Sequence, residues 1–337
     1  MTTVLKERLV NIIRRFGQRR ILVVGDSVAD QFIHGAISRV SREAPVFILK
    51  HEQTETIPGG AANCAVNLAS LGAEVSLVSV LGNDAPGQAV YQRLTSLGVN
   101  CESVSLSDRV HTVTKVRVLA GQVHSLRQQV IRIDYESEPL SDPQLRKSIE
   151  AALQERVPTS DAVIISDYNY GVVNAETASA IRTVSSRKTV PVFVDSRFRL
   201  TSFPGFTSAT PNEDEVEHLL DTVPADASEL ASAAEQLRDQ LDFRALLVTR
   251  GSHGMMLLEQ GVAPLHIEAV GPTEAVDVTG AGDTVIATYA LALASDASFP
   301  DAARLANYAG GLVVMKRGTA SITAQELEHS VANSELP

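Results

Sequence analysis

The stretch GPTEAVDVTGAGDTVIATYALALAS (271–295) joins a glycine turn to an apolar segment of helical length. Its Gly280-Ala281-Gly282 run can offer backbone N–H groups to an anion without large side chains in the way. Asp283 follows in the first turn of the expected helix, where the positive helix end favours a charged carboxylate by ~0.3–1 kcal/mol. We therefore expect Asp283 to be ionised and able to accept a proton. Taken alone, the tetrapeptide also fits a simple helix cap.

Short runs rich in Val, Ile and Leu recur along the chain, separated by segments of helical length. They are apolar almost throughout, as strands covered on both faces are. This alternation predicts an α/β fold, a doubly wound, mainly parallel sheet with helices on both sides. The predicted strands are ILVVGD (21–26), VSLVSVLG (75–82), AVIISD (162–167), VPVFVD (190–195) and ALLVTRG (245–251), and the clearest helices are 61–72, 84–98 and 227–241.

Three of the predicted strands end in a carboxylate, at Asp26, Asp167 and Asp195. In open parallel sheets, ligands bind outside the carboxyl ends of the strands. A single aspartate at such a place is more often a cap or turn residue. Three of them, together with the glycine turn, favour a binding site at this edge of the sheet.

Two regions, 33–57 and 110–135, alternate polar and apolar residues, as strands with one wet face do. We interpret them as a small antiparallel β lid over the site, within one domain that spans 1–337. The exposed edges and apolar face of such a lid need cover. A two-fold arrangement is the commonest solution, so the sequence predicts a homodimer through the lid strands.

Composition narrows the classes of partner. The 337 residues carry a formal net charge of -11 and no long block of Lys and Arg, which argues against a nucleic-acid partner. The longest apolar run, 285–294, is too short to span a bilayer. The N-terminus reads as an amphipathic helix and not as a signal peptide. We expect a soluble, cytoplasmic protein with no membrane partner, whose Cys64 and Cys101 are free thiols.

A second glycine element, PGGAANCAVNLASLG (58–72), places a Gly-Gly pair at a helix start, where backbone can approach a ligand closely. The chain has no P-loop and no G-x-G-x-x-G after its first strand. With Gly59-Gly60-Ala61-Ala62-Asn63 and Asp277-Val278-Thr279-Gly280-Ala281-Gly282-Asp283, it resembles the ribokinase-like (PfkB-type) sugar kinases over nearly its full length. An N-x-x-E motif at 212–215 and a V-T-x-G-x-x-G motif at 248–254 extend the resemblance.

The resemblance implies ATP-dependent phosphorylation of a sugar hydroxyl and a role for each matching residue. Asp283 would be the general base, a role that typically contributes ~10²–10⁴ in rate. Positioning and charge neutralisation would supply the larger share. Gly280, Ala281 and Gly282 would form the anion hole, Asp26, Gly59, Gly60 and Asn63 would hold the sugar, and Asn212 and Glu215 would act through Mg²⁺ and its waters. Thr249, Gly251, Gly254 and Asn307 would lie along ATP, and Asp277 and Thr279 stand where many family members bind a monovalent cation such as K⁺.

Several segments look most like the kinases that phosphorylate the anomeric hydroxyl of heptose 7-phosphate, a step toward ADP-heptose for lipopolysaccharide. They are 38–49, 127–137, 165–173, 278–294 and 306–328. A phosphorylated sugar needs cations facing its phosphate, and the available arginines include Arg39, Arg42 and Arg197, besides Arg117 and Arg132.

The chain also departs from those kinases. It has Arg42 where they carry Pro, Asn169-Tyr170 in place of Gly-Lys in D-Y-G-K-G, and Ser196-Arg197 in place of Pro-Lys in D-P-K. Alternatives are therefore a kinase for another sugar or sugar phosphate, such as a hexose phosphate, ribose or a nucleoside, and a non-catalytic sugar or nucleotide sensor on the same fold. The nucleotidyltransferase domain that often follows these kinases is not in the sequence, so we expect any adenylyl transfer to need a separate protein.

Overall fold

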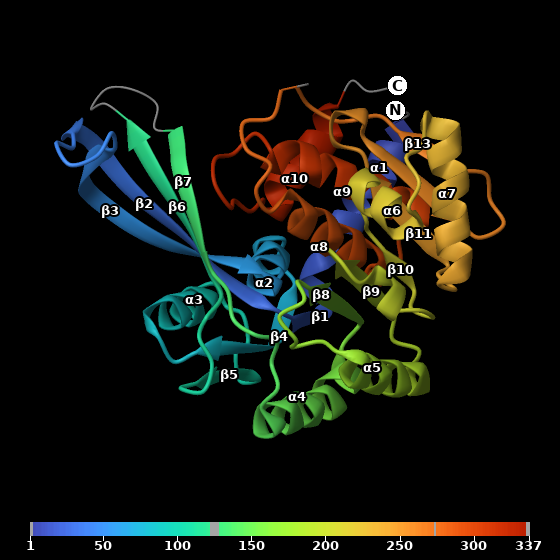
Figure 1. Cartoon of the computed structure of the whole chain (residues 1–337). Coiled ribbons are helices and arrows are strands. Elements are labelled where there is room, and N and C mark those ends of the chain that lie inside the picture. Colours follow the sequence, from blue (N-terminus) through green and yellow to red (C-terminus); the bar gives the residue numbers. More distant parts are fainter. Residues whose placement is uncertain (1–2, 122–127, 273, 335–337) are drawn as a thin grey trace.

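The computed structural model describes residues 3–121, 128–272 and 274–334 (Figure 1). In this part of the chain the larger sheet has nine strands, in the order β13-β12-β11-β10-β9-β8-β1-β4-β5. Pairing is parallel from β5 to β11 and antiparallel for β12 and β13, which confirms the predicted mainly parallel sheet. The strands are β1 (Arg20–Gly25), β4 (Glu74–Gly82), β5 (Val104–Ser107), β8 (Ala162–Asp167), β9 (Val192–Ser196), β10 (Ser208–Ala209), β11 (Ala245–Thr249), β12 (Met255–Glu259) and β13 (Leu265–Ile267).

Helices cover both faces of this sheet and enclose two hydrophobic cores. Along β1, Ile21 and Val23 point into one core while Leu22 and Val24 point into the other, which explains why the strand is apolar throughout. The helices are α1 (Thr3–Ile13), α2 (Ala61–Ser70), α3 (Ala85–Ser96), α4 (Pro143–Arg156), α5 (Ala175–Lys188), α6 (Glu213–Leu220), α7 (Ala227–Gln240), α8 (Ala281–Ala294), α9 (Phe299–Val313) and α10 (Ala324–Asn333).

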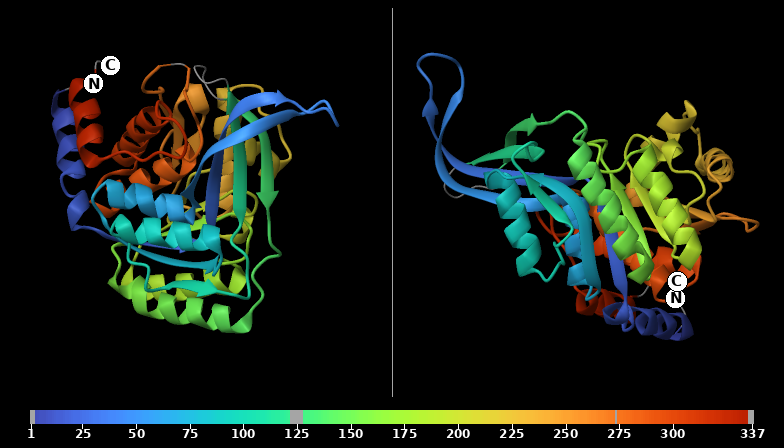
Figure 2. Two further views of the ribbon diagram at one scale, coloured as in Figure 1. Left: turned by 90° about the vertical axis from the view of Figure 1, so that its left-hand side faces the viewer. Right: turned by 90° about the horizontal axis from the view of Figure 1, so that it is seen from below.

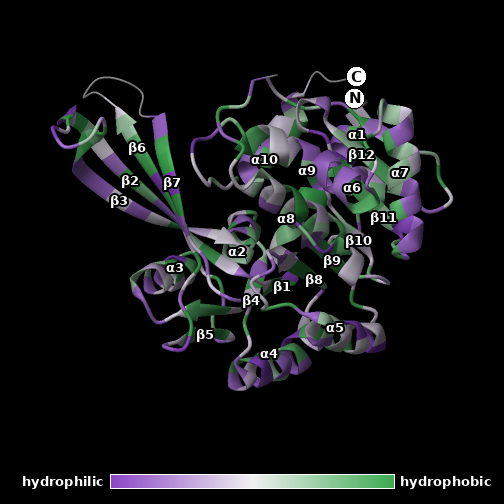
Figure 3. Ribbon diagram, in the orientation of Figure 1, coloured by the Kyte–Doolittle hydropathy of each residue, from purple (hydrophilic) through white to green (hydrophobic). Residues whose placement is uncertain are grey.

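Figure 3 shows β1 and β8 coloured mostly as hydrophobic, whereas the outer helices α4, α5 and α7 carry both colours. Cys64 and Cys101 are buried and free, as predicted. Among the described helices, none is long and apolar enough to cross a membrane.

A second, four-stranded sheet projects from the larger one (Figures 1 and 2). It contains β2 (Ser27–Val40), β3 (Phe47–Gly60), β6 (Thr114–Gly121) and β7 (Gln128–Tyr135), in the order β3-β2-β6-β7. We call this sheet the lid. Each hairpin is antiparallel, but the central β2–β6 pair is parallel, because both strands leave the main sheet in the same direction.

The lid meets the main sheet at the point where the strand order reverses. From β1 the chain builds outward through β4 and β5, then returns to place β8 on the other side of β1. Such a reversal leaves a crevice at the carboxyl ends of the two central strands, which is the usual ligand site in open α/β sheets.

Candidate active site

The glycine turn opens helix α8, and Asp283 lies in its first turn. Gly280 is the N-cap with φ 76°, and no side chain caps the helix. The Ala281 N–H donates to the Val278 carbonyl at 3.2 Å, whereas the N–H groups of Gly282 and Asp283 have no partner among the described residues and remain available to an anion. A Cβ on Gly280 would approach Asn63 Nδ2 to 2.6 Å. Glycine is therefore required here both for its backbone conformation and for the close approach of Asn63.

Both carboxylate oxygens of Asp283 accept hydrogen bonds from residues far away in the sequence. Asn63 Nδ2, on α2, donates to Oδ2 at 2.7 Å, and the Tyr168 hydroxyl, after β8, donates to Oδ1 at 3.0 Å. Only 4% of Asp283 is exposed. The two glycine motifs thus meet at one buried carboxylate, with Tyr168 as a third participant that the motifs did not indicate.

Burial raises the pKa of Asp283 to about 7, although the hydrogen bonds from Asn63 and Tyr168 lower it. The expectation of a fully ionised Asp283 therefore needs correction, because removal from water outweighs the favourable helix end. A carboxyl group that titrates near neutral pH is well matched to general-base work, since proton transfer is most effective when the pKa lies near the working pH.

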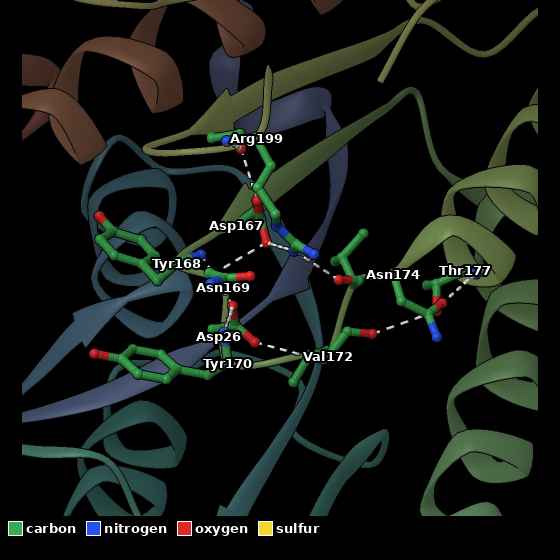
Figure 4. Close-up of polar contacts among 11 residues, drawn as sticks. Asp26, Asp167, Tyr168, Asn169, Tyr170, Val172, Asn174, Thr177 and Arg199 are labelled. Atoms are coloured by element: carbon green, nitrogen blue, oxygen red, sulfur yellow. Dashed lines mark hydrogen bonds and ion pairs between the residues drawn. The ribbon is translucent and has the colours of Figure 1, made fainter. Parts of the chain in front are cut away.

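Asp26 has a different role from the predicted one of holding the sugar. Its carboxylate accepts backbone N–H groups from Tyr168 (2.9 Å), Tyr170 (3.0 Å) and Val172 (2.9 Å), as Figure 4 shows. It is 1% exposed, and burial raises its pKa to about 6. Asp26 therefore fixes the loop that carries Tyr168 toward Asp283, and its oxygens are occupied by that loop.

The other two strand-end aspartates also differ from each other. Asp167 accepts hydrogen bonds from Ser196 Oγ (2.6 Å) and from Arg199, which ties β8 to the chain after β9 (Figure 4). The Asp195 carboxylate, by contrast, has no hydrogen-bond or ion-pair partner among the described residues. Burial raises its pKa well above the usual range, and the charges of Asp283 and Glu215 add to this effect. The Asp195 carboxylate is thus uncompensated and close enough to Asp283 for the two charges to interact.

Asp30, on β2, is a site residue that the sequence reasoning missed. It is 6% exposed, pairs with Arg117, and its negative charge helps to raise the pKa of Asp283. A Cβ on Gly59 would lie 2.6 Å from Asp30 Oδ2. The available signal was an acidic residue in SVADQF, a strand start that is otherwise apolar or uncharged.

Gly60 is the N-cap of α2 with φ 58°, and a Cβ there would lie 2.5 Å from the Asp26 carbonyl oxygen. The Gly59-Gly60 pair therefore lets the end of β3 pass directly against the chain around Asp26 and Asp30. The structure brings Gly59, Gly60 and Asn63 together beside Asp283.

Most of the residues expected around ATP and its Mg²⁺ lie after β10 and β11, whereas Asn307 lies on α9. Asn212 and Glu215 form a capping box at the start of α6, and Asn212 bridges to Thr249. The turn after β11 contains Gly251 and Gly254, with φ 52° and 80°. Asn307, on α9, donates its amide to the Glu268 carbonyl at 2.7 Å.

Asp277 and Thr279 form a separate small loop next to the glycine turn that opens α8. The Asp277 carboxylate accepts N–H groups from Thr279 and Gly318, both at 2.9 Å. These hydrogen bonds hold the pKa of Asp277 below its usual value, although burial opposes them. The loop is therefore ordered around a charged carboxylate.

Two of the three arginines predicted for the sugar phosphate are not brought to this site. Arg39 lies near the outer end of β2 and Arg42 in the turn that follows it. With ~3.3 Å per strand residue, Arg39 is roughly 30 Å along β2 from Asp30, too far for its side chain to reach. Arg197, just after β9, does belong here, since its charge acts on both Asp195 and Glu215.

Several known proteins are similar in sequence to this chain. The family model described as pfkB family carbohydrate kinase matches residues 19–326. The bifunctional protein HldE of Photobacterium profundum is 42% identical over 327 residues, and that of Pseudomonas entomophila 40% over 326 residues; each alignment covers 95% of this chain and 65% of the relative. The chain thus spans 65% of the length of these relatives.

Solved structures match the fold at low identity. A ribokinase from Arabidopsis thaliana in complex with ribose and ATP has a TM-score of 0.71 at 22% identity, covering 94% of this chain and 99% of the ribokinase. Phosphofructokinase-2 from Escherichia coli, in complex with substrates and products, has a TM-score of 0.74 at 18% identity, covering 93% and 98%. With its family model matched over most of its length, the chain belongs to the pfkB family of carbohydrate kinases and is an ATP-dependent sugar kinase.

Proposed function

We propose that this sugar kinase transfers the γ-phosphate of ATP to the anomeric hydroxyl of heptose 7-phosphate. The observation that carries the choice of sugar is the similarity to proteins named HldE, at 42% identity across 95% of this chain. The heptose-kinase-like segments, which include the loop that holds Tyr168 beside Asp283, support it. A place in ADP-heptose synthesis for lipopolysaccharide belongs to the same proposal.

In this mechanism the sugar hydroxyl replaces one of the present hydrogen-bond partners of Asp283 and gives up its proton to that carboxylate. The partner that is not displaced, Asn63 or Tyr168, then holds the Asp283 side chain in position. The N–H groups of Gly282 and Asp283, in the first turn of α8, would face the phosphoryl group as its negative charge develops. Asp30 and the backbone at Gly59 border the sugar, in place of Asp26.

Asp195 and Glu215 fit a Mg²⁺ ion that accompanies ATP. The Asp195 carboxylate has no partner among the described residues, and burial raises the pKa of both carboxyl groups. Mg²⁺ usually keeps several waters and uses one or two carboxylates together with substrate phosphates. When bound, Mg²⁺ would neutralise charge on the ATP phosphates.

We assign the remaining predicted residues to ATP and to a monovalent cation. Thr249, Gly251, Gly254 and Asn307 would line the nucleotide, and the loop of Asp277 and Thr279 would hold K⁺. We also place the enzyme in the cytoplasm, where ATP is available.

We propose a homodimer formed through the lid. Strand β7 forms one edge of the lid, and on one of its faces Ile131, Ile133 and Tyr135 are exposed, with exposed fractions of 53%, 42% and 60%. A second copy would cover these apolar side chains and the open strand edge.

A panel of acceptors tests the choice of sugar. Purified protein would be given ATP, Mg²⁺ and, separately, heptose 7-phosphate, fructose 6-phosphate, ribose and adenosine. We expect the highest kcat/KM with heptose 7-phosphate. Efficient turnover of another acceptor beside none of heptose 7-phosphate would contradict the proposal. Binding of sugar and ATP without turnover of any acceptor would favour the sensor.

A further inference from the structure

The side of the lid that faces the site carries an ordered set of charges. Residues two apart along a strand share a face, and Asp30 and Thr319 approach each other to 3.5 Å on this one. In the lid register, one row of opposed residues is Asp30–Lys115–Asp134, and the next row on the same face is Phe32–Arg117–Arg132.

All but one of these charged side chains form an ion pair with another described residue. Arg117 pairs with Asp30, and Arg132 makes two hydrogen bonds of 2.7 Å to the carboxylate of Asp134. Lys115 stands between the two aspartates in the register but has no hydrogen bond or ion pair to any described residue. The face therefore holds three cations against two carboxylates, and Lys115 is the cation left over.

Lys115 also lies at the sugar side of the general base. Its Nζ is 5.6 Å from the ring centroid of Tyr168, whose hydroxyl donates to Asp283. The side chain is half-buried, and burial lowers the pKa of Lys115. The charges of Arg132 and Arg197 lower it further, against the opposing effect of Asp30 and Asp134. A partly desolvated cation next to two others is costly without an anion.

We propose that Lys115, flanked by Arg132 and Arg197, binds the phosphate group that the sugar substrate already carries. This inference rests on the proposed function and names the cations that would recognise the phosphate group of its sugar. ATP is a less suitable occupant, because the residues assigned to the nucleotide lie at β11 and α9, while Lys115 projects from β6 over Tyr168. In this proposal Lys115 and its two arginine neighbours take the phosphate-binding role that the sequence suggested for Arg39 and Arg42, which lie at the far end of the lid.

Replacement of the cation tests the assignment. For Lys115→Met, kcat/KM would be measured with heptose 7-phosphate and with the same heptose lacking phosphate. Loss of a charge-assisted contact lowers affinity by about 10-fold to 150-fold. We expect the preference for the phosphorylated sugar to fall by that factor. Lys115→Arg should retain most of the preference. Lys50→Met, on exposed β3 of the same lid, is the matched control and should leave it unchanged.

Equal losses with the two sugars, or a loss seen mainly as a higher KM for ATP, would overturn the assignment, because Lys115 would then act on the transferred phosphoryl group. Calorimetric titration of both sugars keeps the test independent of turnover. Tighter binding of the phosphorylated sugar by the wild type, abolished in Lys115→Met, supports the phosphate site even if no acceptor is turned over. Phosphate-dependent binding without turnover of any acceptor would contradict the proposed kinase activity but not the phosphate site. Equal binding of the two sugars by the wild type would refute the phosphate site.

Discussion

Removing the Tyr168 hydroxyl should make the general base harder to ionise. In the free enzyme this hydroxyl donates to Asp283 Oδ1 at 3.0 Å and thereby lowers the pKa of Asp283, which burial raises to about 7. A hydrogen bond to a charged group contributes roughly 1.5 kcal/mol at the lower end of its range, which corresponds to about one pH unit. Tyr168→Phe keeps the ring beneath Lys115 and deletes only the donor.

The acid limb of kcat/KM reports ionisation in the free enzyme, so it is the quantity to measure. We expect Tyr168→Phe to move this limb to higher pH by about one unit. At pH 7 the ionised share of Asp283 would fall from about one half to about one tenth, so kcat/KM would fall about fivefold and recover at higher pH.

Tyr170→Phe is the matched control for this measurement. Tyr170 lies two residues away on the same loop, and its hydroxyl donates to Glu136 at 2.8 Å and not to Asp283. Its profile should overlay that of the wild type. If the acid limbs of Tyr168→Phe and Tyr170→Phe coincide, then either the contact with Asp283 is absent in solution or Asp283 is not the base.

Four further predictions concern Asp283, Asn63 and the neighbouring Asp277 loop. Asp283→Asn should lower turnover by about 10²–10⁴ while ATP affinity is kept. Folding raises the pKa of Asp283 from 3.8 to about 7, so the buried carboxyl group destabilises the protein increasingly as pH rises from about 4 to 7. In urea melts, the free energy of unfolding of Asp283→Asn should exceed that of the wild type by up to about 4 kcal/mol at pH 8 and by less at pH 5. Asn63→Ala should raise the KM for sugar more than that for ATP, and equal increases would contradict its assignment. Asp277→Ala should remove activation by added KCl, and a variant that still responds to K⁺ but not to Na⁺ would place the cation elsewhere.

The periodic, locally encoded part of the fold could be predicted from sequence. The alternation of apolar runs with helical segments predicted the strands around β1 and β8. Strands that are buried on both faces of a sheet consist almost entirely of residues such as Val, Ile and Leu, so they are visible in the sequence. The lid was recognised from its alternating pattern. Its central parallel pair was not, since the relative direction of β2 and β6 depends on where each strand leaves the main sheet.

The site was predictable only where glycine or helix geometry fixed it. Gly280 and Gly60 need positive φ, and Asn63 and Asp283 lie on helices that start at those glycines, so the motif carried the geometry. Tyr168 and Lys115 follow from tertiary packing, in which the loop after β8 and the lid come together over α8. No local spacing in the sequence records that approach.

Hydrogen-bond satisfaction separates the acids that build this site from those that are free to react. Asp26 and Asp195 both end central strands, and burial raises the pKa of both. Three backbone N–H groups donate to the Asp26 carboxylate and offset the free energy lost when it leaves water, so Asp26 stabilises a loop. Asp195 has no such donor among the described residues and is repelled by Asp283. Only a bound cation or a protonated state relieves that repulsion. The unpartnered carboxylate of Asp195 therefore indicates where a ligand must supply positive charge. Its position at the end of a strand, which is all that the sequence shows, does not distinguish it from Asp26.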